Sequence, residues 1–198
     1  MIEAALELVA ESEADDVTLR AVARRAGVSA GAPYHHFPDK DALLAAVARD
    51  GFESLARIQL EIAGGGGSAP DRLERLATAY VLFAWNHQTH YGLMFKTLPT
   101  DVVGTEAGAL REAALQAFGR LVDAIRAANP DLADDESTAR ALLAWSLAHG
   151  AVDVGRWGGA LRPGFDAEAL AADVGREVRH LALERRCVRA GSPRPAPG

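Results

Sequence analysis

The fold of this chain is decided by one stretch, Thr18–Lys40, which reads TLRAVARRAGVSAGAPYHHFPDK. Its first half predicts a short helix, because a threonine that can cap the first turn precedes apolar residues at helical spacing. Three arginines in this half lie off the apolar positions, so we expect them to face solvent or phosphate. Gly27 follows the last apolar position, where helices commonly end in a left-handed residue.

A second helix is predicted directly after this turn, with Ser29 as its N-cap. A proline in its first turn costs little, because the first N–H groups of a helix have no partner within it. Val28 is expected to be a buried contact in the turn, and Phe37 to pack inward. Pro38 ends the helix, and a new one begins at Asp39. Two short helices joined in this way form a helix-turn-helix.

The surface of the second helix suits close approach to DNA. Small side chains at the front of a recognition helix let the backbone reach base edges, and Ala32 and Pro33 can contact thymine methyl groups. Tyrosine, histidine and lysine can position a protein on phosphate oxygens without reading sequence. The predicted DNA contacts are Thr18, Ser29, Ala30, Gly31, Ala32, Tyr34, His35, His36 and Lys40. The alternative is an ordinary helical hairpin whose tyrosine and histidines lie on its surface without binding DNA.

These motifs resemble the DNA-binding domain of the tetracycline-repressor (TetR) family over about residues 2–50. The similar features are the Gly-Val-Ser turn at 27–29, Tyr-His-His-Phe at 34–37 and Pro-Asp-Lys-Asp-Ala-Leu-Leu at 38–44. The second half of the chain resembles the WHG domain of one branch of that family, through Trp145, His149 and Gly150 and through Tyr-Gly-Leu-Met-Phe at 91–95. The resemblance implies an effector-binding second domain whose last two long helices pair with those of a partner subunit.

Composition narrows the class of protein further. Of 198 residues, 49% are hydrophobic but only 6% aromatic, and the abundance of alanine and leucine favours helices over strands. No apolar run approaches the ~20 residues that span a membrane, and no signal peptide precedes the first helix. Together with a single cysteine, Cys187, this predicts a cytoplasmic protein with no disulfide and no membrane partner.

The distribution of charged residues favours DNA binding only around the helix-turn-helix. The whole chain has a net charge of −6, and residues 1–50 carry five basic against nine acidic side chains. Residues 18–40 alone carry four basic side chains and one acidic one. Members of the family often have a basic arm ahead of the first helix, and the printed sequence begins within that helix. We therefore expect weak non-specific DNA binding with a modest dependence on salt.

The rest of the chain predicts only helices. They are expected at 2–11, from Asp39 past Ile58, and at 71–87, 105–128, 137–157 and from 166 onward, with a short apolar segment at 91–98. With the helix-turn-helix, this makes an all-α protein of about nine helices and no sheet. We expect a three-helix DNA-binding domain at 1–50, a helical effector-binding and dimerisation domain at 51–188, and a disordered tail at 189–198 that is rich in proline and glycine.

A homodimer is expected on physical grounds as well. A two-fold pair places two helix-turn-helix units on the half-sites of a palindromic operator, about one turn of DNA apart. The segment 137–157 is apolar on most sides, as buried and interfacial helices are. The predicted interface residues are Val152, Leu170, Val174, Val178 and Leu181.

Bulky residues of the second domain are candidates for the wall of an effector pocket. They are Trp85, Met94, Phe95, Phe118, Trp145 and His149. Because His149 lies four residues before Asp153, the two are neighbours on a helix. His149 is either a structural histidine, satisfied by that carboxylate or by a carbonyl, or a polar anchor for a ligand.

Neither catalysis nor metal binding is expected. Ser146, His149 and Asp153 superficially resemble a nucleophile, a base and an orienting acid, but residues on one helix face cannot form a triad with an oxyanion hole. His87 and His90 could share a metal, but no third ligand lies nearby in the sequence. We expect His90 to cap a helix C-terminus instead, and we assign no catalytic residue, no metal and no cofactor.

The leading hypothesis is a dimeric transcriptional regulator that is not an enzyme. It would be a repressor, released from double-stranded operator DNA by an unknown small-molecule effector. One alternative is a small helical hydrolase that uses His149. The other is a helical interaction module with a vestigial helix-turn-helix. The net negative charge of the N-terminal domain is the reason to retain this alternative.

Overall fold

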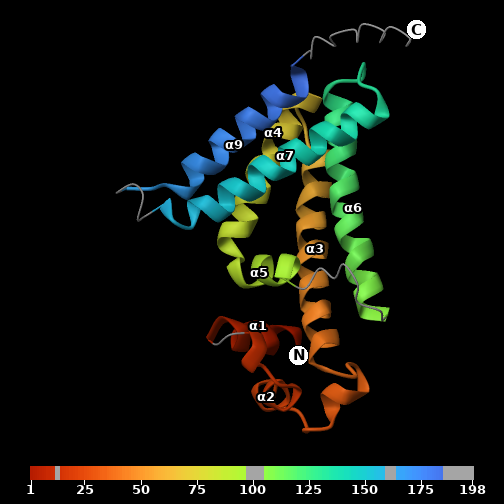
Figure 1. Cartoon of the computed structure of the whole chain (residues 1–198), viewed down its shortest axis with the longest axis vertical. Coiled ribbons are helices and arrows are strands. Elements are labelled where there is room, and N and C mark those ends of the chain that lie inside the picture. The colour runs from red at the N-terminus through yellow and green to blue at the C-terminus, as the bar shows by residue number, and fades with distance from the viewer. Residues whose placement is uncertain (12–13, 97–104, 159–163, 185–198) are drawn as a thin grey trace, which may run out of the picture.

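The computed structural model describes residues 1–11, 14–96, 105–158 and 164–184. Within these ranges the chain forms eight α-helices and two short 3-10 helices, and no strand. The predicted all-α fold is therefore confirmed. Figure 1 shows an elongated molecule with the N-terminal helices at one end and α4, α7 and α9 at the other. The predicted tail at 189–198 and Cys187 lie outside the described residues.

The N-terminal end contains α1 (Ile2–Glu11), the 3-10 turn η1 (Ala14–Asp16), α2 (Leu19–Arg25) and the 3-10 turn η2 (Ala32–His35). The Thr18 side chain caps α2 by accepting a hydrogen bond of 3.2 Å from the backbone N–H of Ala21. Gly27 has a φ of 70°, the left-handed conformation predicted for the residue that ends this helix. The helix-turn-helix thus begins and turns where the sequence predicts.

The second element of the helix-turn-helix differs from the prediction. It is a single 3-10 turn rather than an α-helix, and Gly31 rather than Ser29 is its N-cap, without a side-chain hydrogen bond. Backbone bonds to the residue three positions back run from Ala32 to His36, and only the N–H of Phe37 reaches back four, to Pro33. Pro33 has no N–H and its ring is fully buried, which favours this tighter winding.

The longest helix, α3 (Lys40–Gly64), joins the two halves of the molecule. The Asp39 side chain caps it, accepting a 2.8 Å hydrogen bond from Ala42. Its 25 residues span about 37 Å at 1.5 Å per residue. The predicted domain boundary at residue 50 falls in the middle of α3. The two predicted domains therefore share this one helix.

The second half of the chain is a helical bundle built from α4 (Ala69–Asn86), α5 (Gln88–Lys96), α6 (Thr105–Ala128), α7 (Asp134–Gly155) and α9 (Ala167–Leu183). Helix α6 packs along α3, α9 packs chiefly on α4, and the short α5 packs on α3 (Figure 1). Gly175 permits the α4–α9 contact, because a Cβ there would lie 2.8 Å from the carbonyl oxygen of Glu74. None of the described helices is long and apolar enough to cross a bilayer.

Helix α7 begins three residues earlier than the predicted segment 137–157. Its first turn holds Asp134, Asp135 and Glu136, and carboxylates in this position are stabilised by the partial positive charge of a helix N-terminus. The apolar periodicity used in the prediction could not detect this polar turn.

Candidate nucleic-acid interface and effector cavity

Most of the predicted DNA contacts lie on the surface of the helix-turn-helix. Thr18, Ser29, Ala30, Gly31, Tyr34, His35 and His36 are exposed, and Ala32 and Lys40 are half-buried. Two expectations are wrong. Pro33 is fully buried and cannot reach a thymine methyl group, and Val28 is 43% exposed rather than a buried contact. An exposed valine in the turn adds to the surface that can approach DNA.

The three arginines of α2 do not all face solvent freely. Arg25 lies 3.1 Å from the Glu7 carboxylate and 2.5 Å from that of Glu11, and so ties α2 to α1. Its hydrogen bonds and positive charge lower the pKa of the Glu11 carboxyl. Arg20 and Arg24 are exposed and make no ion pair with any described residue. Two of the three arginines thus remain for phosphate contacts.

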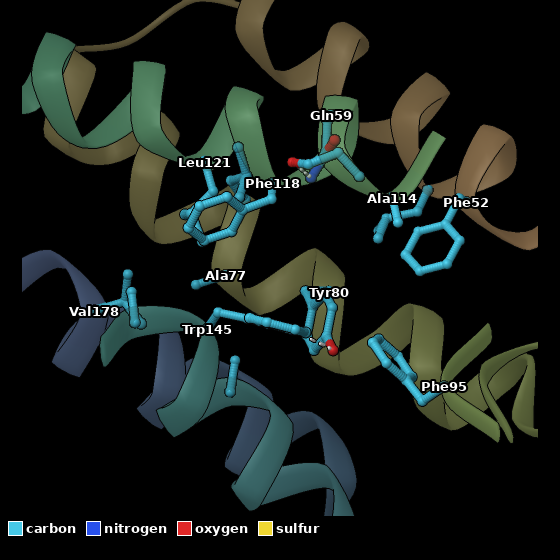
Figure 2. A pocket seen from close by; sticks show the side chains of 15 residues that line it. Phe52, Gln59, Ala77, Tyr80, Phe95, Ala114, Phe118, Leu121, Trp145 and Val178 are labelled. Atoms are coloured by element: carbon cyan, nitrogen blue, oxygen red, sulfur yellow. Dashed lines mark hydrogen bonds between the residues drawn. The ribbon is translucent and has the colours of Figure 1, made fainter. Parts of the chain in front are cut away.

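A cavity of about 80 Å³ lies in the second domain between α3, α4, α5, α6, α7 and α9 (Figure 2). Fifteen side chains line it and none is charged. They are Phe52, Leu55, Gln59, Leu76, Ala77, Tyr80, Phe95, Ala114, Ala117, Phe118, Leu121, Ala144, Trp145, Ala148 and Val178. Such an apolar wall with few polar groups is typical of a small-molecule site.

Three of the six predicted pocket residues line this cavity: Phe95, Phe118 and Trp145. The other three do not. Met94 is buried against α3, and Trp85 packs on Phe165 with ring centroids 5.5 Å apart. His149 lies behind the wall, with its ring centroid 4.5 Å from that of Phe95.

The prediction missed the α3 side of the cavity and Tyr80. Phe52, Leu55 and Gln59 follow one another at spacings of three and four along α3, so they share a face of that helix. This spacing is visible in the sequence. A glutamine on an otherwise apolar helix face is the signal that could have identified this wall.

A hydrogen-bonded network lies at the Phe95 side of the cavity. The indole N–H of Trp145 donates to the Tyr80 hydroxyl oxygen over 3.1 Å. The hydroxyl groups of Tyr80 and Tyr91 lie 3.0 and 2.6 Å from Nδ1 of His149. Burial raises the pKa of Tyr80 to about 12 and also raises that of Tyr91. Both phenols are therefore neutral at physiological pH, and one of them can donate to the single lone pair of Nδ1.

The same geometry bears on the hydrolase alternative. Nδ1 of His149 faces the two tyrosine hydroxyl groups, and its Nε2 lies 3.7 Å from the Asp153 carboxylate. The Ser146 hydroxyl donates instead to the carbonyl of Leu142 over 2.8 Å. Ser146, His149 and Asp153 therefore form no nucleophile–base–acid chain. In this structure the polar neighbours of the His149 ring are the two tyrosine hydroxyl groups, and its role as a structural residue or as a ligand anchor stays a prediction.

His87 and His90 serve different contacts. Nε2 of His90 lies 3.1 Å from the Asp50 carboxylate on α3, so it does not cap a helix as expected. His87 is itself the C-cap residue of α4 and packs on Phe83. Among the described residues, no three His, Cys, Asp or Glu side chains gather in a way that could hold a metal ion.

The short helix α5 connects the cavity to α3. Phe95 lines the cavity and Tyr91 belongs to the network beside it, whereas His90 pairs with α3. Met94 packs so closely on Gly51 of α3 that a Cβ there would lie 2.8 Å from its sulfur. Helix α5 also contacts α1. A displacement of Phe95 would thus reach both the long helix and the N-terminal domain.

The predicted dimer residues prove to be largely internal. Val152, Val174 and Val178 are buried within one chain, and Leu170 and Leu181 are half-buried against its core. These valines cannot form a subunit interface, because their own chain already covers them. Apart from Leu183 at the end of α9, the exposed large apolar residues of the region lie on α7 and just beyond its end. They are Leu142, Leu143, Leu147, Val154 and Trp157.

Comparison with known proteins agrees with this architecture. Residues 1–47 match the family described as bacterial regulatory proteins, tetR family, and residues 73–184 match the tetracyclin repressor-like C-terminal domain. The second match alone covers more than half of the chain. The protein is a helix-turn-helix protein with a helical second domain, and it belongs to the TetR family. Its assignment to the WHG branch stays a prediction.

Individual relatives are similar over part of their length. The HTH-type transcriptional regulator BetI of Escherichia coli strain S88 is 30% identical over 48% of this chain and 57% of its own length. The HTH-type transcriptional repressor Rv1474c of Mycobacterium tuberculosis strain H37Rv is 35% identical over 39% and 44%. The chain thus spans about half the length of the curated relatives it matches. A solved protein of unknown function from Rhodococcus sp. RHA1 is 26% identical, covering 90% of this chain and 91% of its own, with a TM-score of 0.75.

Proposed function

We propose that the protein is a dimeric transcriptional repressor that is released from operator DNA when a small molecule enters the α3–α9 bundle. One observation carries this function: a single helix, α3, begins at the exposed helix-turn-helix and forms a wall of the apolar cavity. The similar proteins BetI, a transcriptional regulator, and Rv1474c, a transcriptional repressor, support regulation and repression respectively. We place the protein in the cytoplasm and assign it no catalytic activity.

The small size of the cavity explains how an effector would release the protein from DNA. At about 80 Å³ it is smaller than the ~150 Å³ apolar cavity that accepts benzene in another protein. A drug-sized effector must therefore widen it. A ligand that binds the widened form better shifts the population toward that form. Because Phe95 belongs to a nine-residue helix, we expect this wall to move most easily.

The movement would reach DNA through α5. Met94 rests directly on Gly51, so α3 cannot stay in place if α5 moves toward it. The contact of α5 with α1 moves the N-terminal domain in the same step. Two recognition elements held on one palindrome tolerate little change in their separation, because the half-sites lie one helical turn apart.

The outer face of α7 is the subunit interface in this proposal. Leu143, Leu147 and Val154 are exposed at spacings of four and seven, so they form one apolar stripe. Ser146 and Gly150 are exposed on the same face, and no atom lies within 4 Å of a Cβ built at Gly150. Small residues there allow a partner helix to approach closely.

Selection of binding sites from random duplex DNA tests the function. The purified protein is expected to enrich a palindromic sequence whose half-sites are about one helical turn apart. Its affinity should fall as salt rises, as phosphate contacts require. If no sequence is enriched by a folded protein, the helix-turn-helix is vestigial and the interaction-module alternative replaces this proposal.

A further inference from the structure

The effector cavity adjoins a second hollow that opens between α3, α4 and α6. This outer cleft has a volume of about 340 Å³, and it shares Gln59 and Leu76 with the inner cavity. These two side chains therefore form the partition between the two spaces. Unlike the inner cavity, the outer cleft has charged residues in its wall, namely Arg72, Arg120 and Asp123.

Gln59 presents an unsatisfied acceptor at this partition. The residue is only 6% exposed, and its Nε2 donates to the carbonyl oxygen of Ala117 over 3.3 Å. That bond fixes the orientation of the amide, because the reverse orientation would bring two oxygens together. The remaining oxygen, Oε1, is buried and has no hydrogen-bond partner among the described residues. A buried acceptor left unpaired destabilises the fold, so a ligand that donates a hydrogen bond to it gains affinity.

Arg120 presents a complementary unsatisfied donor. It lies three residues after Ala117 on α6, and its side chain lines the outer cleft. One of its terminal nitrogens, NH1, is buried without a partner in the described part of the chain. The nearby carboxylate of Asp123 pairs with Arg126 instead. A guanidinium in this state favours an acceptor oxygen from a ligand.

The geometry points to an amphiphile as the effector, with an apolar chain in the inner cavity and an amide-like head in the outer cleft. Its N–H donates to Oε1 of Gln59, and its carbonyl oxygen accepts from Arg120. The uncharged, aromatic-rich wall of the inner cavity excludes the polar head and holds the chain (Figure 2). This inference rests on the proposed function only in calling the ligand an effector.

Two probes of equal chain length test the head group on the purified full chain. Octanamide carries both N–H donors and a carbonyl acceptor, whereas methyl octanoate carries acceptors only. We expect octanamide to bind about tenfold more tightly, the value of one buried hydrogen bond of roughly 1.4 kcal/mol. Isothermal titration calorimetry measures both affinities. Equal affinities for the two probes, or no binding of either, would overturn the inference.

Variants assign the effect to the two residues. Gln59→Leu should remove the preference for octanamide, while Gln116→Leu, a matched change at an exposed position of α6, should retain it. Arg120→Gln should weaken both probes about tenfold because both carry a carbonyl, and Arg111→Gln should weaken neither. Circular dichroism confirms the fold of each variant. A preference that survives Gln59→Leu, or unchanged affinities in Arg120→Gln, contradicts the inference.

The outcome is separable from that of the DNA experiment. A protein that enriches a palindrome but shows no head-group preference retains the proposed function and loses this ligand assignment. A protein that shows the expected preference but selects no DNA retains the ligand site and loses the regulatory role.

Discussion

At the scale of single residues, we expect two roles in the helix-turn-helix: some side chains position it on phosphates, and others determine which bases it prefers. Lys40 is a predicted phosphate contact, so in Lys40→Ala affinity should fall about equally for all sequences and the salt slope should fall by ~1 per subunit. Enlarging the half-buried Ala32 to Leu should instead change which bases are preferred, because a larger side chain alters the approach to the groove. Fluorescence anisotropy over a salt series, with operator variants, measures both. Identical effects of the two changes would contradict these separate roles.

Tyr80 makes a prediction about alkaline pH. Burial holds the pKa of Tyr80 near 12 in the folded protein, against ~10 in an unfolded chain. Between these values the unfolded state loses the proton first, so stability is complete below pH 10 and falls toward pH 12. The loss from this residue is about 2–3 kcal/mol. Urea unfolding from pH 8 to 12 should show a shallower decline in Tyr80→Phe.

The exposed Tyr34 supplies the control for this experiment. Tyr34→Phe should retain the decline of the unmodified protein, because its ring is 52% exposed and lies outside the buried network. Tyr80→Phe should also lower stability at neutral pH by about 1–3 kcal/mol, since the Trp145 N–H loses its acceptor. Parallel alkaline curves for the two variants would show that Tyr80 does not cause the decline.

Single residues also show where prediction from sequence ended. Thr18 and Gly27 were predictable, because a cap and a left-handed turn depend on neighbouring residues alone. The partners of His149 and His90 were not, because they come from positions more than 35 residues away in the sequence. Helical spacing offered Ser146 and Asp153 as neighbours of His149, whereas the fold also brings Tyr80 and Tyr91 to its Nδ1.

At the scale of elements, the contact between α5 and α3 should be sensitive to one methyl group. Gly51→Ala would place a Cβ 2.8 Å from the Met94 sulfur, so one of the two helices must shift. We expect a loss of about 1–3 kcal/mol in the free energy of unfolding, as in other overpacked cores. The altered α3 should also weaken operator binding without any ligand. Urea unfolding and anisotropy measure the two effects.

Gly119→Ala on α6 is the matched control, because nothing lies within 4 Å of a Cβ there. It should stabilise the protein by about 0.5–1 kcal/mol, since alanine is the better helix former. If Gly51→Ala behaves like this control and binds operator normally, α5 and α3 are not coupled through this contact.

Helices whose apolar residues repeat regularly were predicted to within a few residues, as α1, α6 and α9 show. The recognition element was not, because a four-residue turn that contains Pro33 has too few bonds for periodicity to distinguish 3-10 from α. Helix α7 is apolar on most sides, so its sequence could not show which face meets its own chain. The structure separates the buried Val152 from the exposed Leu143 and Leu147.

At the scale of the whole molecule, this division of α7 predicts how the proposed dimer forms. Leu143→Asp with Leu147→Asp places two charges on the exposed stripe, where burial against a partner would cost several kcal/mol. Analytical ultracentrifugation at micromolar concentration should show twice the chain mass for the unmodified protein and a single chain mass for the variant. Operator affinity should fall in parallel, because one recognition element alone contacts one half-site. Leu115→Asp is the control: Leu115 is exposed on α6 rather than on α7, and its variant should remain dimeric. A double variant that stays dimeric, with its helical content intact, would exclude α7 as the interface, and the charged outer face of α9 would be the next surface to test.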